Sequence, residues 1–314
     1  MRYYTINIID PETKTKIMQF SSLREDGSNN PGALDVELDI PVYTFDAPTG
    51  AAQVKIWGIS IQDIGAAFNL NEKTIEIYAG MTKGLPLANP QQNGLLLRGT
   101  IQQAFGNWEG ELQSLDLIIM ADVGSSSLSK NFVLNWKKGT LLADAIKSTL
   151  AVALPDYTST IDINPNLVLN QDEPGYWQSV VQFAQYIKMV SQHIIGGTYQ
   201  GVRIVLKEKS FDVYDGTTAK EPFPIQFVDL IGQPTWLGLG NLQFKCVMRA
   251  DIVVGNYISL PRGQATTTAQ SYSQFRKKTS FEGNFVIGPL VRHVGHFRQP
   301  NGSSWVSIFN AYVP

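Results

Sequence analysis

The sequence is poor in cysteine, in charge and in long apolar runs, and each scarcity excludes a class of protein. Cys246 is the single cysteine among 314 residues, which excludes an internal disulfide and a cysteine-based zinc site. Charged residues make up 17% and the net charge is −2, so a general nucleic-acid binder with a basic patch is not expected. No run approaches the roughly eighteen apolar residues of a membrane span. The N-terminus alternates like a strand, so we expect neither a cleaved signal nor an anchor.

Histidine is also scarce, and the pattern around it predicts no metal centre. His293 and His296 lie three residues apart, so on a strand they point to opposite faces. No carboxylate cluster is expected beside them, and we interpret both, with His193, as ordinary surface or interface residues. The chemistry of a metal site is therefore not predicted from histidine.

Carboxylates give two weak patterns for chemistry, and neither predicts a site. A set of side chains matches four positions of a calcium loop, namely Asp162, Asn164, Asn166 and Glu173. The sixth position of that loop is Leu167 where glycine is required. Glu109 and Glu111 flank a turn and are interpreted as solvated residues. We expect no cofactor, no metal and no enzymatic activity.

Alternating apolar and polar residues are what the sequence does contain, and they predict β-strands. Hydrophobic residues make up 43% of the chain. In residues 243–248 the alternation places Phe244, Cys246 and Met248 on one face, which is expected to be core. Residues 225–230, 242–248 and 252–260 are predicted as strands joined at tight turns, and residues 95–105 and 112–120 as a hairpin. This pattern indicates a β-barrel.

Helical patterns are confined to the middle of the chain and to one short segment. Residues 140–153 and 177–195 are predicted as amphipathic helices, the second ended by Gly196 and Gly197. Residues 60–68 are predicted as a short helix capped by Ser60, with Asp63 three residues later. Residues 202–206 and 210–214 are predicted as a hairpin. The middle of the chain is therefore predicted to form a small α/β domain.

These patterns divide the chain into three predicted parts. The fold class is mainly β with an α/β insert, in which two β-barrels flank a small α/β domain. We place the first barrel at residues 1–123, the α/β domain at 124–220 and the second barrel at 221–314. A long polar loop, 262–280, is predicted as a contact with a partner because loops of this length in compact domains usually have a function.

Several segments together resemble the baseplate hub protein of contractile-tailed bacteriophages. In the second half they are NWKKGT (135–140), FAQYI (183–187), DGT (215–217), DLIGQPTW (229–236), MRADI (248–252), GN (255–256) and LP (260–261). In the first half they are VKIWGI (54–59), IEIYAG (75–80) and LRGTI (97–101). The resemblance covers nearly the whole chain, and it consists of packing and turn patterns without a catalytic signature. No spike or lysozyme domain is appended, so the spike is expected to be a separate protein.

The resemblance implies a homotrimer in which each subunit supplies two tail-tube-like β-barrels, which flank the α/β domain, to a pseudo-sixfold ring. Such a ring adapts the sixfold tail tube to a threefold central spike, and DNA passes through its lumen without specific binding. Expected partners are the spike, the tail tube or tail-tip ring protein and other baseplate proteins, in a virion assembled in the host cytoplasm. Candidate partner contacts are Trp236, Arg262, Arg276, Lys277 and Lys278. Candidate lumen carboxylates are Asp35, Glu37 and Asp39.

Other functions remain open from the sequence. A carbohydrate-binding or receptor-binding tail-tip protein would also be rich in strands and exposed aromatic residues. A peptidoglycan-cleaving enzyme would need a carboxylate pair or metal triad in a cleft, and none is readable, so it ranks last. A bacterial contractile injection particle related to phage tails is equally compatible with the sequence.

Overall fold

The computed structural model describes the chain in two compact units. The described residues are 1–46, 50–82, 90–120, 131–197, 199–207, 210–217, 221–238, 240–261, 283–301 and 304–313. Unit 1 comprises Met1–Val42, Ala51–Asp122 and Glu221–Pro314, and unit 2 comprises Tyr43–Gly50 and Val123–Lys220. Both ends of the chain therefore fold into the same unit, and the middle of the chain forms the other. The predicted loop 262–280 lies outside the described residues.

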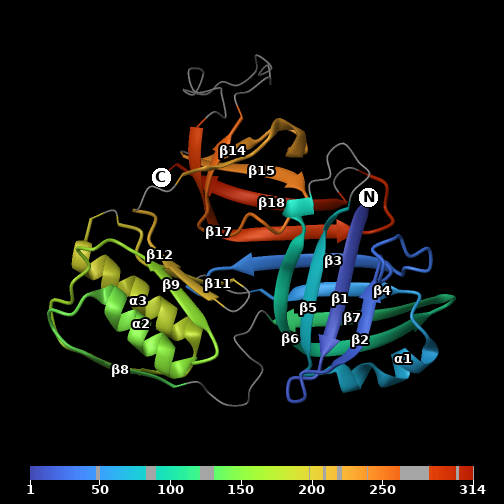
Figure 1. Cartoon of the computed structure of the whole chain (residues 1–314), viewed down its shortest axis with the longest axis horizontal. Helices are drawn as coiled ribbons and strands as arrows, with labels where there is room; N and C mark the ends of the chain where they lie inside the picture. Colours follow the sequence, from blue (N-terminus) through green and yellow to red (C-terminus); the bar gives the residue numbers. More distant parts are fainter. Residues whose placement is uncertain are drawn as a thin grey trace. The chain divides into compact units, whose positions relative to one another are not determined.

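Unit 1 is built on one long, mostly antiparallel sheet (Figure 1). Its strands from the first part of the chain are β1 (Arg2–Ile9), β2 (Lys16–Ser21), β3 (Asp35–Tyr43), β4 (Ala52–Trp57), β5 (Thr74–Met81), β6 (Gly94–Glu109) and β7 (Leu112–Met120). Those from the last part are β13 (Phe223–Pro224), β14 (Thr235–Gly238), β15 (Asn241–Val247), β16 (Tyr257–Leu260), β17 (Gly283–His296) and β18 (Trp305–Tyr312). The main path runs β14-β15-β18-β17-β3-β4-β7-β6-β5-β1-β2.

The strand order contains a repeat of four strands. The order β14-β15-β18-β17 is followed directly by β3-β4-β7-β6, and each set consists of two hairpins joined side by side through their inner strands. A further strand also pairs with the first half of the last member of each set, β16 on β17 and β5 on β6. Residues 1–123 and 221–314 thus supply two similar modules to one sheet.

Strict alternation creates the core of unit 1. On β3 the side chains of Val36, Leu38 and Ile40 are buried, while their neighbours in sequence face the other side. The predicted core residues Phe244, Cys246 and Met248 are all buried. Because one face of each strand is apolar, burial fixes the register of the whole sheet.

Unit 2 is a small α/β layer arrangement. Its helices are α2 (Leu142–Ala153) and α3 (Val180–Ile195), and its strands are β8 (Phe132–Trp136), β9 (Thr158–Asp162), β10 (Glu173–Trp177), β11 (Arg203–Lys207) and β12 (Ser210–Tyr214). The predicted hairpin is β11 and β12, and β9 joins it in parallel to β12. The helix α3 begins after Ser179, whose side chain accepts from the Gln182 amide, and ends at Gly196. The mainly β fold with an α/β insert is confirmed.

Segment 43–50, predicted within the first barrel, belongs to unit 2. Phe45 is buried in the core of that unit, and its amide donates to the Ile204 carbonyl at 2.9 Å. Asp46 pairs with Lys188 of α3 at 2.7 Å. These contacts join residues more than a hundred positions apart in the chain. Local sequence patterns could therefore not predict them.

Several predicted elements differ from the structure for identifiable reasons. Residues 225–230 are no strand, because a 3-10 turn at Phe227–Asp229 directs the Asp229 carboxylate to a buried arginine. Of residues 252–260 only Tyr257–Leu260 is a strand, since Val253 and Asn256 close a turn. Trp177 ends β10 and does not begin a helix. The short helix α1 (Ile61–Ala66) has the predicted Ser60 cap, and a 3-10 turn follows it.

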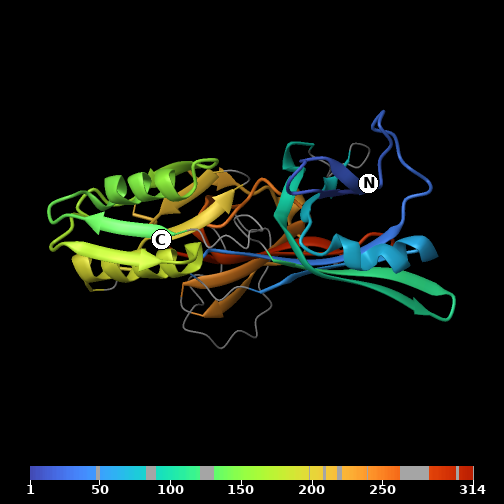
Figure 2. The same cartoon turned by 90° about the horizontal axis from the view of Figure 1, so that it is seen from below.

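The hairpin of β6 and β7 is the longest projection of the described sheet. The two strands pair from Thr100 with Met120 out to Glu109 with Leu112. In Figure 2 their paired ends extend past the neighbouring strands, with α1 beside them. None of the helices in the described residues has the length and apolar character needed to span a membrane.

Candidate functional site: the polar face of the long sheet

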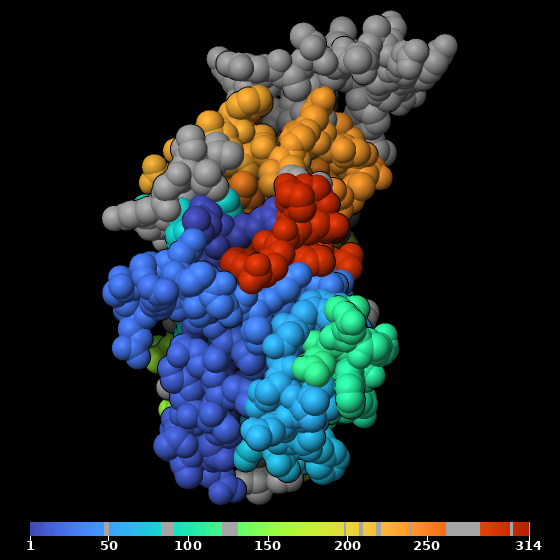
Figure 3. Space-filling view, turned by 90° about the vertical axis from the view of Figure 1, so that its right-hand side faces the viewer, coloured from blue at the N-terminus to red at the C-terminus, as the bar shows by residue number. Residues whose placement is uncertain are grey.

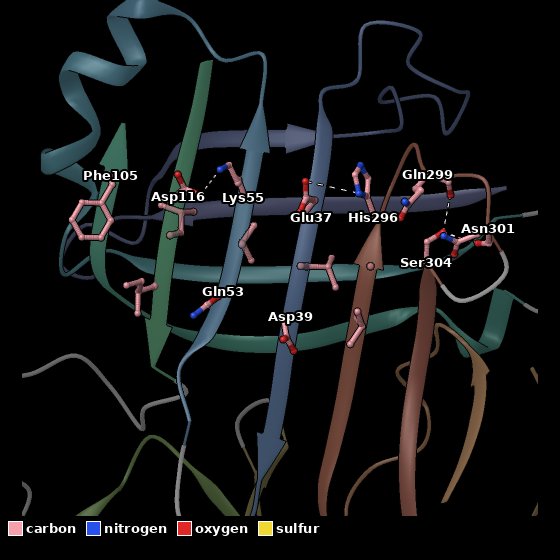
Figure 4. Close-up of a pocket in the computed structure, with 16 residues that line it drawn as sticks. Glu37, Asp39, Gln53, Lys55, Phe105, Asp116, His296, Gln299, Asn301 and Ser304 are labelled. Carbon is pink, nitrogen blue, oxygen red and sulfur yellow. Dashed lines mark hydrogen bonds and ion pairs between the residues drawn. The ribbon is translucent and has the colours of Figure 1, made fainter. Parts of the chain in front are cut away.

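The outward face of the central strands carries most of the organised charge of unit 1. Asp35, Glu37 and Asp39 alternate along β3 with buried residues, as the sequence predicts, and lie on one face. The next strand, β4, places Gln53, Lys55 and Trp57 opposite Asp39, Glu37 and Asp35. Asp116 of β7 lies opposite Lys55. Figure 4 shows Glu37, Asp39, Gln53, Lys55 and Asp116 on adjacent strands of the same face.

Ion pairs on this face cross from strand to strand. The Lys55 ammonium lies 3.6 Å from the Asp116 carboxylate and 4.2 Å from the centre of the Trp57 ring. The Trp57 indole N–H donates to Glu37 at 2.8 Å. These contacts join three neighbouring strands, β3, β4 and β7, through their exposed side chains.

A second group of ion pairs joins β3 to β17, where the two four-strand modules meet. The Arg292 guanidinium binds Asp39 through two nitrogens, one of them at 2.7 Å. His296 Nε2 lies 2.9 Å from Asp35, and its Nδ1 lies 3.8 Å from Glu37 (Figure 4). The charges therefore bridge the seam between residues that are over two hundred positions apart.

The expectation of no carboxylate beside the histidines is wrong for His296. It failed because Asp35 and Glu37 reach His296 only through the β3 and β17 pairing. His293 is no surface residue either, being 3% exposed with its Nδ1 2.8 Å from the Ser307 hydroxyl. Burial lowers the pKa of His293 to about 4.

The polar face is hollowed into an open cavity of about 650 Å³. Its labelled lining in Figure 4 is Glu37, Asp39, Gln53, Lys55, Phe105, Asp116, His296, Gln299, Asn301 and Ser304. Around this cavity four carboxylates, on Asp35, Glu37, Asp39 and Asp116, lie beside two cations, Lys55 and Arg292, and Lys245 of β15 lies further along the same face. The face therefore carries an acidic excess.

No catalytic arrangement is evident on this face in the described residues. Each acidic residue there lies against a cation, a histidine or an indole N–H, so none is held as a buried, isolated acid. Among the described residues no group of three metal-ligating side chains converges. Of the residues that match a calcium loop in part, Asn164 accepts from the Asn166 amide, and Glu173 accepts from the Tyr186 hydroxyl on another element.

The predicted partner-contact residues have different outcomes. Trp236 lies on β14, half-buried, with its ring 6.1 Å from that of Phe285. Arg262, Arg276, Lys277 and Lys278 lie outside the described residues.

A buried charge cluster was missed by the sequence reasoning. Arg249 is 1% exposed, and it donates to Asp229 at 2.9 Å and to both oxygens of Asp251 at 2.7 Å. Gln92, from the other module, donates to Asp229 at 3.1 Å. The available signal was an arginine directly after the buried face of β15, which requires a buried partner. This cluster joins the two modules beneath the sheet.

Comparison with known proteins places this fold among those of phage tail proteins. No protein-family model matches the sequence, and no curated protein matches it. The fold is shared with the 43 kDa tail protein of prophage MuSo2 from Shewanella oneidensis, with a TM-score of 0.52 and 6% identity over 99% of this chain and 96% of that chain. The expected tail-protein fold is thereby confirmed; at this identity the likeness concerns the fold.

Two further structures resemble the chain less closely in shape. The tail protein of Neisseria meningitidis MC58 has a TM-score of 0.49 and 11% identity, over 99% of this chain and 96% of that chain. The E. coli c3393 protein, described as a component of the type VI secretion system, has a TM-score of 0.49 and 11% identity, over 91% of this chain and 75% of that chain.

Proposed function

We propose that this chain is the structural baseplate hub of a contractile phage tail. Three copies form a ring of pseudo-sixfold symmetry that joins a sixfold tail tube to a threefold central spike. The proposal rests on the duplicated four-strand order within one sheet. Because each chain supplies two similar modules, three chains present six similar units to a sixfold partner. The fold shared with a prophage tail protein over nearly the full length of both chains supports it.

The polar sheet face is the surface we assign to the lumen. The acidic excess from Asp35, Glu37, Asp39 and Asp116 repels phosphates, so this surface would not bind DNA tightly as it passes through the lumen. The Arg292 ion pair with Asp39 and the His296 contact with Asp35 at the module seam fix the orientation of these carboxylates. The lumen role requires no catalytic group, which agrees with a structural protein.

Carbohydrate binding is the weaker candidate on the same face. Sugar rings stack on open aromatic faces, and Trp57 is the aromatic residue at the middle of the polar face. The Lys55 ammonium already covers its ring, and Glu37 occupies its N–H. These contacts leave little of the indole for a sugar, so we do not propose this function.

The solution mass of the purified protein tests the hub proposal. Light scattering should give about three times 34.7 kDa, either for the chain alone or after addition of the candidate spike protein. Assembly on the spike must be measured as well, because a trimer can depend on it. A chain that stays monomeric with every tail partner, and that binds glycans as a monomer, would contradict the hub proposal.

A further inference from the structure

We propose that the outer edge of β6 beyond Ala104, whose amide donates to the Asn71 side chain at 2.8 Å, pairs antiparallel through residues 105–109 with β14 of a second copy of this chain. The inference rests on the proposed ring and names the strands that close it. In the described residues β5 pairs with β6 only from Gly94 to Thr100, and beyond Ile101 the only strand paired with β6 is β7. β14 is the terminal strand at the other end of the sheet order. Each chain therefore offers two unlike edges.

The seam inside the chain supplies the template for this contact. The second half of β17 pairs with β3, where one module ends and the next begins. The Phe297 amide, just beyond β17, donates to the Val36 carbonyl at 2.8 Å. A Cβ on Gly295 would lie 3.1 Å from Leu38. The strands β3 and β17 run in opposite directions in Figure 4, so the pairing at the seam is antiparallel.

Sequence and register align the two modules strand by strand. Gln53 and Lys55 on β4 correspond to Gln243 and Lys245 on β15, with buried residues between them in both strands. The pairing irregularity of β6 and β7, between Ile101 and Gln103, then matches that of β17 and β18, between Ile287 and Val291. β5 and β16 occupy the same place on β6 and β17. By this alignment, β6 corresponds to β17 and β14 to β3.

The alignment fixes a register between copies. At the seam, the Phe297 and Val36 hydrogen bond places Val294 opposite Asp39. In the module alignment Val294 corresponds to Asn107, and Asp39 corresponds to Thr235. Asn107 of one copy is therefore expected opposite Thr235 of the next. The neighbouring side chains on the same face are Phe105 and Leu237, and Leu237 lies at the irregularity of β14 between Trp236 and Gly238. Phe105 is 45% exposed and Leu237 57% exposed in the single chain.

Apolar side chains on both edges favour this pairing. Exposed edge strands with large apolar residues promote association, and most proteins protect such edges with charge or proline. Pairing would cover the side chains of Phe105 and Leu237 together. Figure 3 shows the end of the β6 and β7 hairpin, in green, exposed at the surface. The strand β2, at the other end of the sheet order, has no counterpart in the four-strand repeat. The seam inside the chain therefore gives no reason to expect β2 to pair with a second copy.

Paired cysteines test the register directly. In an antiparallel pair without mutual hydrogen bonds the Cα atoms are about 4.5 Å apart, which suits a disulfide. The variant Asn107→Cys with Thr235→Cys should therefore form interchain disulfides on mild oxidation and give a covalent trimer on a non-reducing denaturing gel. The native Cys246 does not interfere, because burial raises the pKa of its thiol to about 12.

Single variants and a second pair provide the controls. Neither Asn107→Cys nor Thr235→Cys alone should cross-link, whereas an equal mixture of the two should give covalent dimers and nothing larger. The pair Phe105→Cys with Leu237→Cys should repeat the result if the first pair folds poorly. Asn107→Cys with Ile17→Cys, which places the second thiol on β2, should stay uncross-linked.

The outcomes separate this inference from the hub proposal. A wild-type trimer by light scattering whose two register pairs do not cross-link would overturn the β6 and β14 contact and leave the hub proposal standing. Cross-linking of one single variant would indicate a symmetric contact and also overturn it. A wild-type chain that never self-associates, with or without spike, would overturn both.

Discussion

At the scale of single residues, burial decides which charged and titratable side chains act together. Arg249 and His293 are both buried. Arg249 stays charged between two carboxylates, whereas His293 lies beside a neutral hydroxyl and has its pKa lowered. The same degree of burial therefore has opposite electrostatic consequences, set by the partner.

His293 makes stability depend on pH in a defined window. Its folded pKa, about 4, lies below the ordinary value of 6.5, so between these values the unfolded chain binds more protons. Stability should fall as pH drops through this window, by roughly 3 kcal/mol in total. The variant His293→Gln, which keeps a donor for Ser307, should show a flatter dependence in urea unfolding from pH 7 to pH 4. The exposed His193→Gln is the control, and an unchanged slope in His293→Gln would contradict the assignment.

At the scale of elements, the β6 and β7 hairpin owes its position to contact with α1. A Cβ added at Gly106 would lie 2.6 Å from the Ile64 carbonyl oxygen, so the backbone of α1 packs directly on this glycine. Ser60 caps the helix by accepting from the Asp63 amide at 3.1 Å and donating to the Asp63 carboxylate at 2.7 Å. A short helix of this kind is held mainly by its packing.

Gly106→Ala should therefore destabilise unit 1. Because the clash is with backbone, overpacking should cost about 1–3 kcal/mol in the free energy of unfolding. Gly65→Ala in α1, where nothing lies within 4 Å of the added Cβ, is the matched control and should be neutral or stabilise by up to about 1 kcal/mol. Equal effects of the two substitutions in chemical denaturation would show that α1 does not pack as described.

At the scale of the whole molecule, the sheet joins two modules from opposite ends of the chain. The seam of β3 and β17 carries Arg292 with Asp39 and His296 with Asp35 on its outer side. Beneath it, Gln92 and Asp229 connect the modules from within. Contacts of this kind on both faces of the sheet would suit the ring that we propose, which would have to keep its shape while partners of different symmetry bind to it.

Reversing charge on the polar face should create affinity for DNA. The double variant Asp39→Lys with Asp116→Lys changes an acidic surface to a basic one, and its binding to duplex DNA should weaken steeply with salt. The wild type should show no binding in the same fluorescence anisotropy titration. Asp172→Lys on the exposed surface of unit 2 is the single-site control. If the double variant binds no better than the control, the polar face is not positioned to meet DNA.

The sequence by itself determined the local structure that depends on alternation and on capping. The alternation of Phe244, Cys246 and Met248 specified a buried strand face, and Ser60 and Gly196 specified helix ends, because these signals act over a few residues. The three carboxylates of β3 were correctly placed on one face for the same reason.

Only the tertiary structure decided which distant segments meet. His296 reaches Asp35, and Arg249 reaches Asp229 and Gln92, through strand pairings that no local pattern encodes. The 3-10 turn at Phe227–Asp229 replaced an expected strand because satisfying a buried charge outweighed local β preference. The repeat of four strands likewise became visible only once the strand order was known, since register and neighbours are properties of the folded sheet.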